Sequence, residues 1–257
     1  MHDHDTILAR AKALSDLTGA GPERYAVIAA NLIAVWEPPT LTAQSVPGLI
    51  DHTLLAFDAT EKAIEQLCAD AARHRFKAVC VNPVWVATAR EMKRRLGARY
   101  AIAAVVDFPL GASTIAARRA EAQTAIADGA TELDLVIGIG LLKSGRFAAV
   151  YEGIRCAAGL GAYLKVILET SALTEAEKVD GALLAVLAGA DMLKTSTGVN
   201  GKATPDDVRL LRTVAGTVLG VKAAGGIRDR ATFERMVAAG ADRIGSSASC
   251  GIMEEWG

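Results

Sequence analysis

One stretch of the chain reads Asp128-Gly129-Ala130-Thr131-Glu132-Leu133, and two later stretches resemble it. They are Ala188-Gly189-Ala190-Asp191-Met192-Leu193 and Ala239-Gly240-Ala241-Asp242-Arg243-Ile244. In each copy the glycine stands where a helix would end in the left-handed conformation, and an apolar run follows at once. The repeat therefore predicts units in which a helix leads directly into a strand.

The same alternation continues on both sides of these stretches. From residue 46 onward, short apolar runs alternate with helical stretches, and the runs are almost continuous in Val, Ile, Leu and Ala, as in parallel strands buried on both faces. Eight such units predict a (β/α)8 barrel over residues 46–257, with an open doubly wound sheet as the alternative. Against that alternative, no Gly-x-Gly-x-x-Gly follows the first run. The runs are Leu49–Leu55, Ala78–Val81, Ala101–Phe108, Glu132–Ile139, Leu164–Glu169, Met192–Ser196, Val218–Ala223 and Arg243–Ser246.

Residues 1–45 follow a different pattern. Apolar side chains recur at helical spacing between residues 5 and 36, and Gly19-Ala20-Gly21-Pro22 interrupts this spacing once. The segment is too short to enclose a core of its own. We therefore expect an N-terminal helical extension of two helices that packs on the barrel.

Composition narrows the class of protein. The chain has 257 residues with 28 Lys and Arg against 29 Asp and Glu, a balance that does not favour nucleic acid or an acidic membrane as partner. No apolar run approaches the ~18 residues that a membrane span needs. The four cysteines are far apart and form no Cys-x-x-Cys pair, which predicts reduced thiols in a cytoplasmic protein. Histidine spacing shows no metal motif, and His52 is expected to be structural, so we predict neither metal nor cofactor.

Three lysines lie inside apolar runs. Lys165, Lys194 and Lys222 belong to the fifth, sixth and seventh runs, and period-two alternation allows all three to point into the barrel. Burial and mutual repulsion are expected to lower their pKa values, which would let one of them act as a neutral amine nucleophile. The alternative for each lysine is an outward side chain whose stem lies along apolar surface.

Carboxylates and glycine-rich loops accompany the lysines. Asp134 is the expected counter-charge and proton relay, and Asp51 and Glu169 are further candidates. The last two runs end in Gly225-Gly226 and Ser246-Ser247, where this fold commonly binds phosphate through backbone N–H groups. The loop from Thr197 to Lys202 could close over such an anion.

Several motifs resemble those of the deoxyribose-phosphate aldolase family, over about residues 46 to 250. They are Leu49-Ile50-Asp51-His52-Thr53-Leu54, Glu132-Leu133-Asp134-Leu135-Val136, Leu164-Lys165-Val166-Ile167-Leu168-Glu169-Thr170, Lys194-Thr195-Ser196-Thr197-Gly198 and Val221-Lys222-Ala223-Ala224-Gly225-Gly226-Ile227-Arg228. The resemblance implies that Lys194 forms a Schiff base, that Lys222 and Asp134 relay protons, and that Lys165 and Asp51 lie nearby. It also implies phosphate binding by Gly198, Gly225, Gly226, Ser246 and Ser247.

The implied reaction is a reversible class I aldol cleavage. It converts 2-deoxyribose 5-phosphate to acetaldehyde and glyceraldehyde 3-phosphate, so the expected partners are small molecules, with a homodimer as the expected assembly. Some family members use a tyrosine near the C-terminus, whereas the last tyrosine here is Tyr163. Two other functions stay open: a Schiff-base aldolase or transaldolase with a longer ketose donor, and a non-catalytic barrel that binds sugar phosphates.

Overall fold

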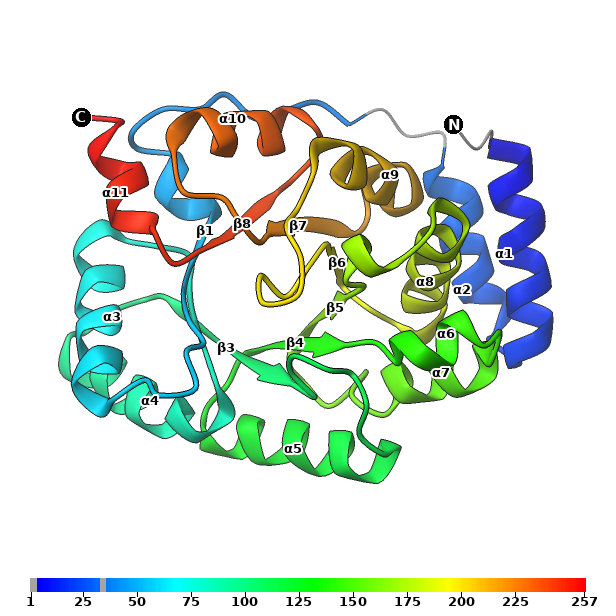
Figure 1. The fold of residues 1–257 in the computed structure, drawn as a ribbon, viewed down its shortest axis with the longest axis horizontal. Coiled ribbons are helices and arrows are strands. Elements are labelled where there is room, and N and C mark those ends of the chain that lie inside the picture. Colours follow the sequence, from blue (N-terminus) through cyan, green and yellow to red (C-terminus); the bar gives the residue numbers. More distant parts are fainter. Residues whose placement is uncertain (1–3, 33–35) are drawn as a thin grey trace.

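The computed structural model describes residues 4–32 and 36–257. Eight parallel strands close into a barrel in chain order, and helices surround it (Figure 1). This confirms the predicted (β/α)8 architecture and excludes the open sheet. The strands are β1 (Ile50–Leu54), β2 (Ala78–Val81), β3 (Ala101–Val106), β4 (Glu132–Val136), β5 (Tyr163–Ile167), β6 (Met192–Lys194), β7 (Gly220–Ala224) and β8 (Arg243–Ser246).

Each strand is followed by at least one helix. Two helices precede the barrel, and the loop after β4 carries two more in succession. The helices are α1 (His4–Thr18), α2 (Pro22–Asn31), α3 (Glu61–His74), α4 (Val86–Arg95), α5 (Ile115–Asp128), α6 (Ile139–Lys143), α7 (Phe147–Arg155), α8 (Glu175–Ala188), α9 (Pro205–Ala215), α10 (Arg230–Ala238) and α11 (Ser249–Glu254). Short 3-10 turns lie at Val46–Leu49, Pro83–Trp85 and Thr170–Ala172. Among the described residues, no helix combines the length and apolarity that crossing a membrane requires.

Local chemistry sets the ends of these helices. The side chain of Thr174 accepts a hydrogen bond from the backbone N–H of Glu177, and the carboxylate of Glu177 accepts one from the backbone N–H of Thr174, so α8 begins with a capping box. The three repeated glycines, Gly129, Gly189 and Gly240, have φ values of 117°, 97° and 123°. Positive φ angles favour glycine, so the glycine of each repeated stretch does lie at the end of a helix, as predicted.

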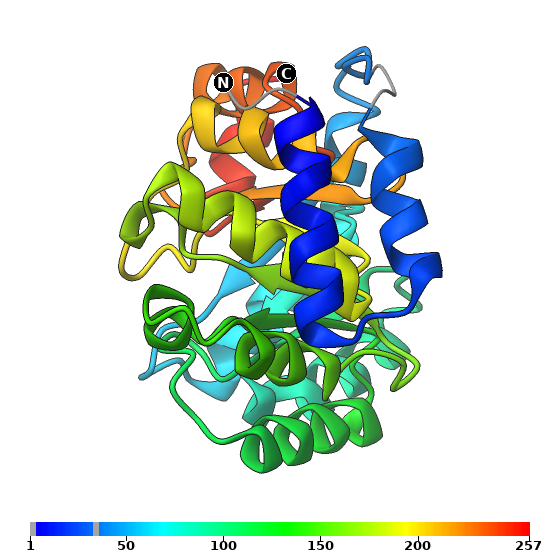
Figure 2. The ribbon, with the colours of Figure 1, turned by 90° about the vertical axis from the view of Figure 1, so that its right-hand side faces the viewer.

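The two N-terminal helices lie outside the ring of barrel helices (Figure 2). Helix α1 contacts α7 and α8, and α2 contacts α8 and α9. Ile7, Ala11 and Leu14 bury the inner face of α1, and Arg10 donates two hydrogen bonds, of 2.6 and 2.8 Å, to the carboxylate of Asp180 on α8. The expected helical extension is therefore confirmed, although residues 33–35 of the predicted helical segment lie outside the described residues. The domain boundary at residue 45 stays a prediction.

The interior of the barrel is chemically divided. Its apolar part is the small cluster of Cys80, Ala103 and Val105 from β2 and β3, against which Leu55 and Phe108 pack. The large core lies instead between the strands and the surrounding helices. The rest of the barrel interior, from β4 round to β1, is occupied by buried charged side chains.

Candidate active site

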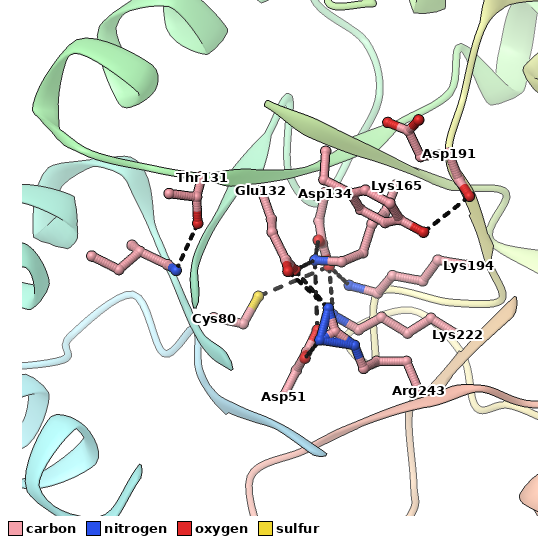
Figure 3. A network of polar contacts seen from close by, with 12 residues as sticks. Asp51, Cys80, Thr131, Glu132, Asp134, Lys165, Asp191, Lys194, Lys222 and Arg243 are labelled. Atoms are coloured by element: carbon pink, nitrogen blue, oxygen red, sulfur yellow. Dashed lines mark hydrogen bonds and ion pairs between the residues drawn. The ribbon is translucent and has the colours of Figure 1, made fainter. Parts of the chain in front are cut away.

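The three strand lysines meet inside the barrel. Lys165, Lys194 and Lys222 come from β5, β6 and β7, all three are buried, and their amines converge on one carboxylate (Figure 3). The register helps, because Lys194 pairs directly with Lys222 and Asp134 with Lys165. The predicted inward orientation is therefore confirmed, and the outward alternative is excluded.

Asp134 is the common partner of these amines. Its Oδ1 accepts a hydrogen bond of 2.7 Å from Lys165. Its Oδ2 accepts bonds of 2.7 Å from Lys194 and 2.8 Å from Lys222. The thiol of Cys80 lies 3.9 Å from the same Oδ2. One carboxylate oxygen thus touches the amines of both Lys194 and Lys222.

A second group of charges completes the network. Asp51 Oδ2 accepts a hydrogen bond of 2.5 Å from Lys222, and Asp51 Oδ1 lies 3.1 Å from Nη1 of Arg243. Arg243 also donates through Nη2 to both oxygens of Glu132, at 2.8 and 2.9 Å, and Glu132 lies 2.5 Å from the amine of Lys165. The network therefore joins β4, β5, β6, β7, β8 and β1.

The network contains more cationic side chains than carboxylates. Its bases are Lys165, Lys194, Lys222 and Arg243, and its acids are Asp51, Glu132 and Asp134. Lys165 lies within ion-pair distance of all three acids and Lys222 of two, whereas Lys194 contacts Asp134 alone. Because an uncompensated buried charge is costly, Lys194 is the member that most readily stays neutral.

The pKa directions follow this division. Burial lowers the pKa of Lys194, and the neighbouring charge of Lys222 lowers it further against the opposing effect of Asp134. Burial also opposes the charge on Lys165 and Lys222, but the carboxylates of Asp134 and Asp51 outweigh it and raise both pKa values. The expectation of lowered pKa values is thus right for Lys194 and wrong for the other two lysines, because it left out the surrounding carboxylates.

The two aspartates stay ionised in this environment. Burial alone would raise the pKa of each, yet the lysines around Asp134 hold its pKa well below the usual range. For Asp51, burial again raises the pKa, but the positive charges of Lys222 and Lys165 outweigh this effect and lower the pKa to about 2. Both carboxylates are therefore hydrogen-bond acceptors at neutral pH.

A pocket of about 340 Å³ opens beside the network. Lys194 is the one network residue that lines it, and Lys165 and Lys222 are not among the lining residues. The other walls come from the C-terminal ends of β1, β7 and β8 and from the loops after β1, β6, β7 and β8. They comprise Thr53, Leu54, Leu55, Ala56, Thr197, Gly198, Val199, Ala224, Gly225, Gly226, Ile227, Arg228, Gly245, Ser246 and Ser247. All five residues expected to bind phosphate therefore border the same pocket as Lys194.

Glycine is required where the loops after β6 and β7 approach each other. Gly225 has φ of 102°, and a Cβ there would lie 2.7 Å from the carbonyl oxygen of Gly201 and 3.2 Å from the Cα of Lys202. Gly198 and Gly226 also have positive φ, at 81° and 78°. Because these glycines have no side chains, the pocket wall here consists of backbone. A phosphate site needs such backbone, since its N–H groups can bind the anion.

The two serines of the cradle differ. The hydroxyl of Ser246 donates to the carbonyl of Ile227 at 2.7 Å and accepts from the N–H of Ala248 at 3.0 Å, so it ties the loop after β8 to the loop after β7. Ser247 is exposed. The hydroxyl of Ser246 is therefore engaged within the protein, whereas Ser247 borders the pocket with an exposed side chain.

Glu169 does not join the lysines. Its carboxylate accepts hydrogen bonds from the N–H and the hydroxyl of Thr197, at 3.1 and 2.5 Å. The suggestion that it serves as a counter-charge is therefore wrong. Its position after β5 instead shapes the loop from Thr197 to Gly201, where a Cβ on Gly201 would lie 3.0 Å from Glu169 Oε1.

Glu132 and Arg243 were missed as members of the site. Glu132 precedes Asp134 by two positions on one strand, so period-two alternation could have placed both on the interior face. Arg243 is the first residue of the last apolar run. Its charge within a strand expected to be buried could have identified it as a member of the site. Tyr163 begins β5 and donates its hydroxyl to the carbonyl of Asp191, so it lies at the strand end opposite the pocket.

Known proteins are similar to this chain in sequence and in fold. The profile of the DeoC/LacD family aldolases matches residues 47–252. A deoxyribose-phosphate aldolase of Geobacillus sp. (strain WCH70) is 47% identical over 214 residues, which cover 82% of this chain and 95% of the relative. Another of that name from Brevibacillus brevis is 50% identical over 208 residues, covering 79% and 93%.

A solved structure agrees with these relatives. The tetrameric deoxyribose phosphate aldolase from Aeropyrum pernix superimposes with a TM-score of 0.77 at 34% identity, covering 84% of this chain and 92% of that one. The range that the profile matches covers most of the barrel and contains every residue of the charged network. The chain therefore belongs to the DeoC/LacD family of aldolases.

Proposed function

We propose that this chain cleaves 2-deoxyribose 5-phosphate reversibly to acetaldehyde and glyceraldehyde 3-phosphate, through a Schiff base on Lys194. The observation that carries the proposal is the position of Lys194. It lines the pocket, it contacts a single carboxylate, and its pKa is lowered. A neutral, accessible amine is what imine formation requires.

In the synthetic direction, the neutral amine of Lys194 attacks the carbonyl carbon of acetaldehyde to give a carbinolamine. Loss of water leaves a protonated imine, whose positive charge draws electrons from the neighbouring methyl group. A proton leaves that carbon and an enamine forms. The enamine carbon then bonds to the aldehyde carbon of glyceraldehyde 3-phosphate, whose oxygen takes up a proton. Water finally hydrolyses the imine and frees the product and Lys194.

Asp134 and Lys222 are the proposed proton relay. Their supporting geometry is the shared Oδ2, which contacts the amines of both Lys194 and Lys222, so one oxygen links the nucleophile to a second amine that can exchange protons with it. Lys165 and Asp51 hold Asp134 and Lys222 in place through their own ion pairs. The phosphate would lie on the loops of Gly198, Gly225, Gly226, Ser246 and Ser247.

Borohydride trapping tests the proposal. Acetaldehyde with borohydride should leave one ethyl group per chain, on Lys194 by peptide mass analysis, because reduction fixes the imine. Lys194→Met should take up none in the pocket, while Lys178→Met, which removes an amine paired with Asp207 away from the pocket, should behave as the parent. Labelling confined to surface lysines would refute the Schiff base.

The same experiment separates the other two functions. An enzyme with a longer ketose donor would not turn over with acetaldehyde as sole donor. A non-catalytic sugar-phosphate-binding barrel would retain phosphate binding and form no adduct at Lys194. Formation of deoxyribose 5-phosphate from the two aldehydes by the parent, and its loss in Lys194→Met, would exclude both.

A further inference from the structure

Three side chains of metal-ligand type meet away from the lysine pocket. His52 lies on β1, Asp70 on α3 and Cys250 on α11, and one ligand atom from each lies within 4.8 Å of the other two. None of the three lines the pocket that contains Lys194. Since Asp51 points into the barrel, alternation along β1 directs His52 to the outer side, toward the helices.

The ring of His52 is buried and incompletely hydrogen-bonded. The side chain is only 6% exposed, and its buried Nδ1 has no hydrogen-bond partner among the described residues. Buried polar atoms are nearly always paired, so this nitrogen is open to a partner that the described side chains and backbone do not supply. A neutral imidazole nitrogen binds a metal ion through its lone pair, so an unpaired ring nitrogen is a suitable donor.

Asp70 and Cys250 complete a mixed donor set. The hydrogen bonds that Asp70 accepts from Gln66 and Arg73 both end on Oδ1, and Oδ2 accepts none from the described residues. A thiol binds a metal ion as the thiolate, so a bound cation would displace the proton of Cys250 into water.

We propose that His52, Asp70 and Cys250 bind one divalent ion of the zinc class, with water as the fourth ligand. Imidazole nitrogen, thiolate and carboxylate together form a donor set that Zn²⁺ favours and that Mg²⁺ and Ca²⁺ do not. Metal–ligand bonds of roughly 2.0–2.3 Å place tetrahedral ligand atoms about 3.3–3.8 Å apart, so the side chains must close by about 1 Å. Arg73 and His74 oppose the added charge, and Glu254 favours it.

The position of the site suggests its role. The ion would join β1 and α3, which follow each other in the sequence, to α11 at the far end of the chain. His52 pairs in register with Ser246, whose hydroxyl ties together the loops after β7 and β8. A bound ion would therefore brace the β1–β8 seam behind the proposed phosphate cradle and take no part in the chemistry at Lys194.

Cobalt is the probe for this site, because a thiolate bound to Co²⁺ produces an intense charge-transfer band that histidine and carboxylate ligands do not. Titration of the reduced, metal-free parent with Co²⁺ should give this band, saturating at one ion per chain. Cys250→Ser should abolish it, and Asp70→Asn should weaken binding by tenfold or more. Cys156→Ser, which alters a buried cysteine elsewhere, should leave the titration unchanged. His4, near the N-terminus, cannot mimic the signal.

Zn²⁺ provides a second readout that does not depend on the spectrum. An ion that binds only the folded state raises the thermal midpoint, so saturating Zn²⁺ should stabilise the parent by several degrees and leave Cys250→Ser unchanged. The proposal is overturned if the parent shows no thiolate band. It is also overturned if the band survives in Cys250→Ser, or if Zn²⁺ stabilises both proteins equally. Because the Lys194 adduct forms independently of this site, failure here leaves the proposed function standing.

Discussion

The reactivity of Lys194 depends on how few carboxylates reach it. Lys165 and Lys222 are equally buried, yet each is held charged by two or more acids, whereas Lys194 meets Asp134 alone. Burial does not therefore select the nucleophile by itself. The selection comes from the uneven distribution of three acids among four bases and from the opening of the pocket beside one of them.

Replacing Lys222 tests this electrostatic account. In Lys222→Leu the stem volume largely remains but the cation that lowers the pKa of Lys194 is gone, and Asp134 acts on Lys194 with less competition. The pKa of Lys194 should rise, so single-turnover imine formation should slow at pH 7 and recover in part as the pH is raised. Stopped-flow measurement of imine formation with acetaldehyde across pH 6 to 10 gives the profile.

Lys165→Met is the matched control, since Lys165 is not among the charges that act strongly on Lys194. Its midpoint should move less than that of Lys222→Leu. If raising the pH restores nothing in Lys222→Leu, the lysine acts purely as a proton relay. Identical profiles in the parent and Lys222→Leu would show that the two amines are not coupled.

Arg243 should prove important for stability. Arg243→Met removes the partner of Glu132 and Asp51 without removing their buried charges, which typically costs about 3 kcal/mol. Arg209→Met is the control, because its pair with Asp206 is exposed and should contribute less than about 1 kcal/mol. Urea unfolding at pH 7 measures both. Similar small losses in the two variants would mean that the interior pair stabilises no more than a surface pair.

At the scale of elements, the strand cores were predictable and their ends were not. The run predicted to extend from Glu132 to Ile139 ends as a strand at Val136, and Ile139 instead begins α6 after Gly138. The run predicted from Val218 starts as a strand at Gly220, and Val218 is exposed in the turn after α9. The apolar run continues past β4 because Ile137 and Ile139 also pack against the core, whereas Val218 is an apolar residue on the surface.

The three loops that form the proposed cradle allow a direct test. Ser247→Asp adds a negative charge at an exposed position on the pocket wall, so it should repel a phosphate dianion. We expect KM for deoxyribose 5-phosphate to rise by tenfold or more with a smaller change in kcat. Ser144→Asp, at an exposed site outside the pocket, should leave KM unchanged. A KM unaffected by Ser247→Asp would show that the phosphate binds elsewhere.

For the molecule as a whole, the repeated glycines and apolar runs were sufficient to predict a barrel, because each encodes a local helix end or a doubly buried strand. The family resemblance is likewise confirmed. The charge network was only partly predictable. Asp51 meets Lys222 and Arg243 because closure brings β1 beside β8, and no local pattern in the sequence contains that contact.

The proposed metal ligands could not be predicted from the spacing of residues in the sequence either, because they meet only in the folded barrel. His52 and Asp70 belong to one βα unit, but Cys250 is distant from both in the chain, so their meeting depends on closure of the barrel and on the position of α11. The expected homodimer also stays a prediction, because such an assembly depends on surface complementarity between two copies. The relative from Aeropyrum pernix is described as tetrameric.

The central claim is that Lys194 and the loops after β6, β7 and β8 act together on one sugar phosphate. The measurement that tests it most directly is a crystal structure of the parent reduced with borohydride in the presence of deoxyribose 5-phosphate. The account predicts continuous density from the sugar carbon to Nζ of Lys194, with the phosphate on the backbone of Gly198, Gly225 and Gly226. An adduct on Lys165 or Lys222, or a phosphate outside that pocket, would contradict it.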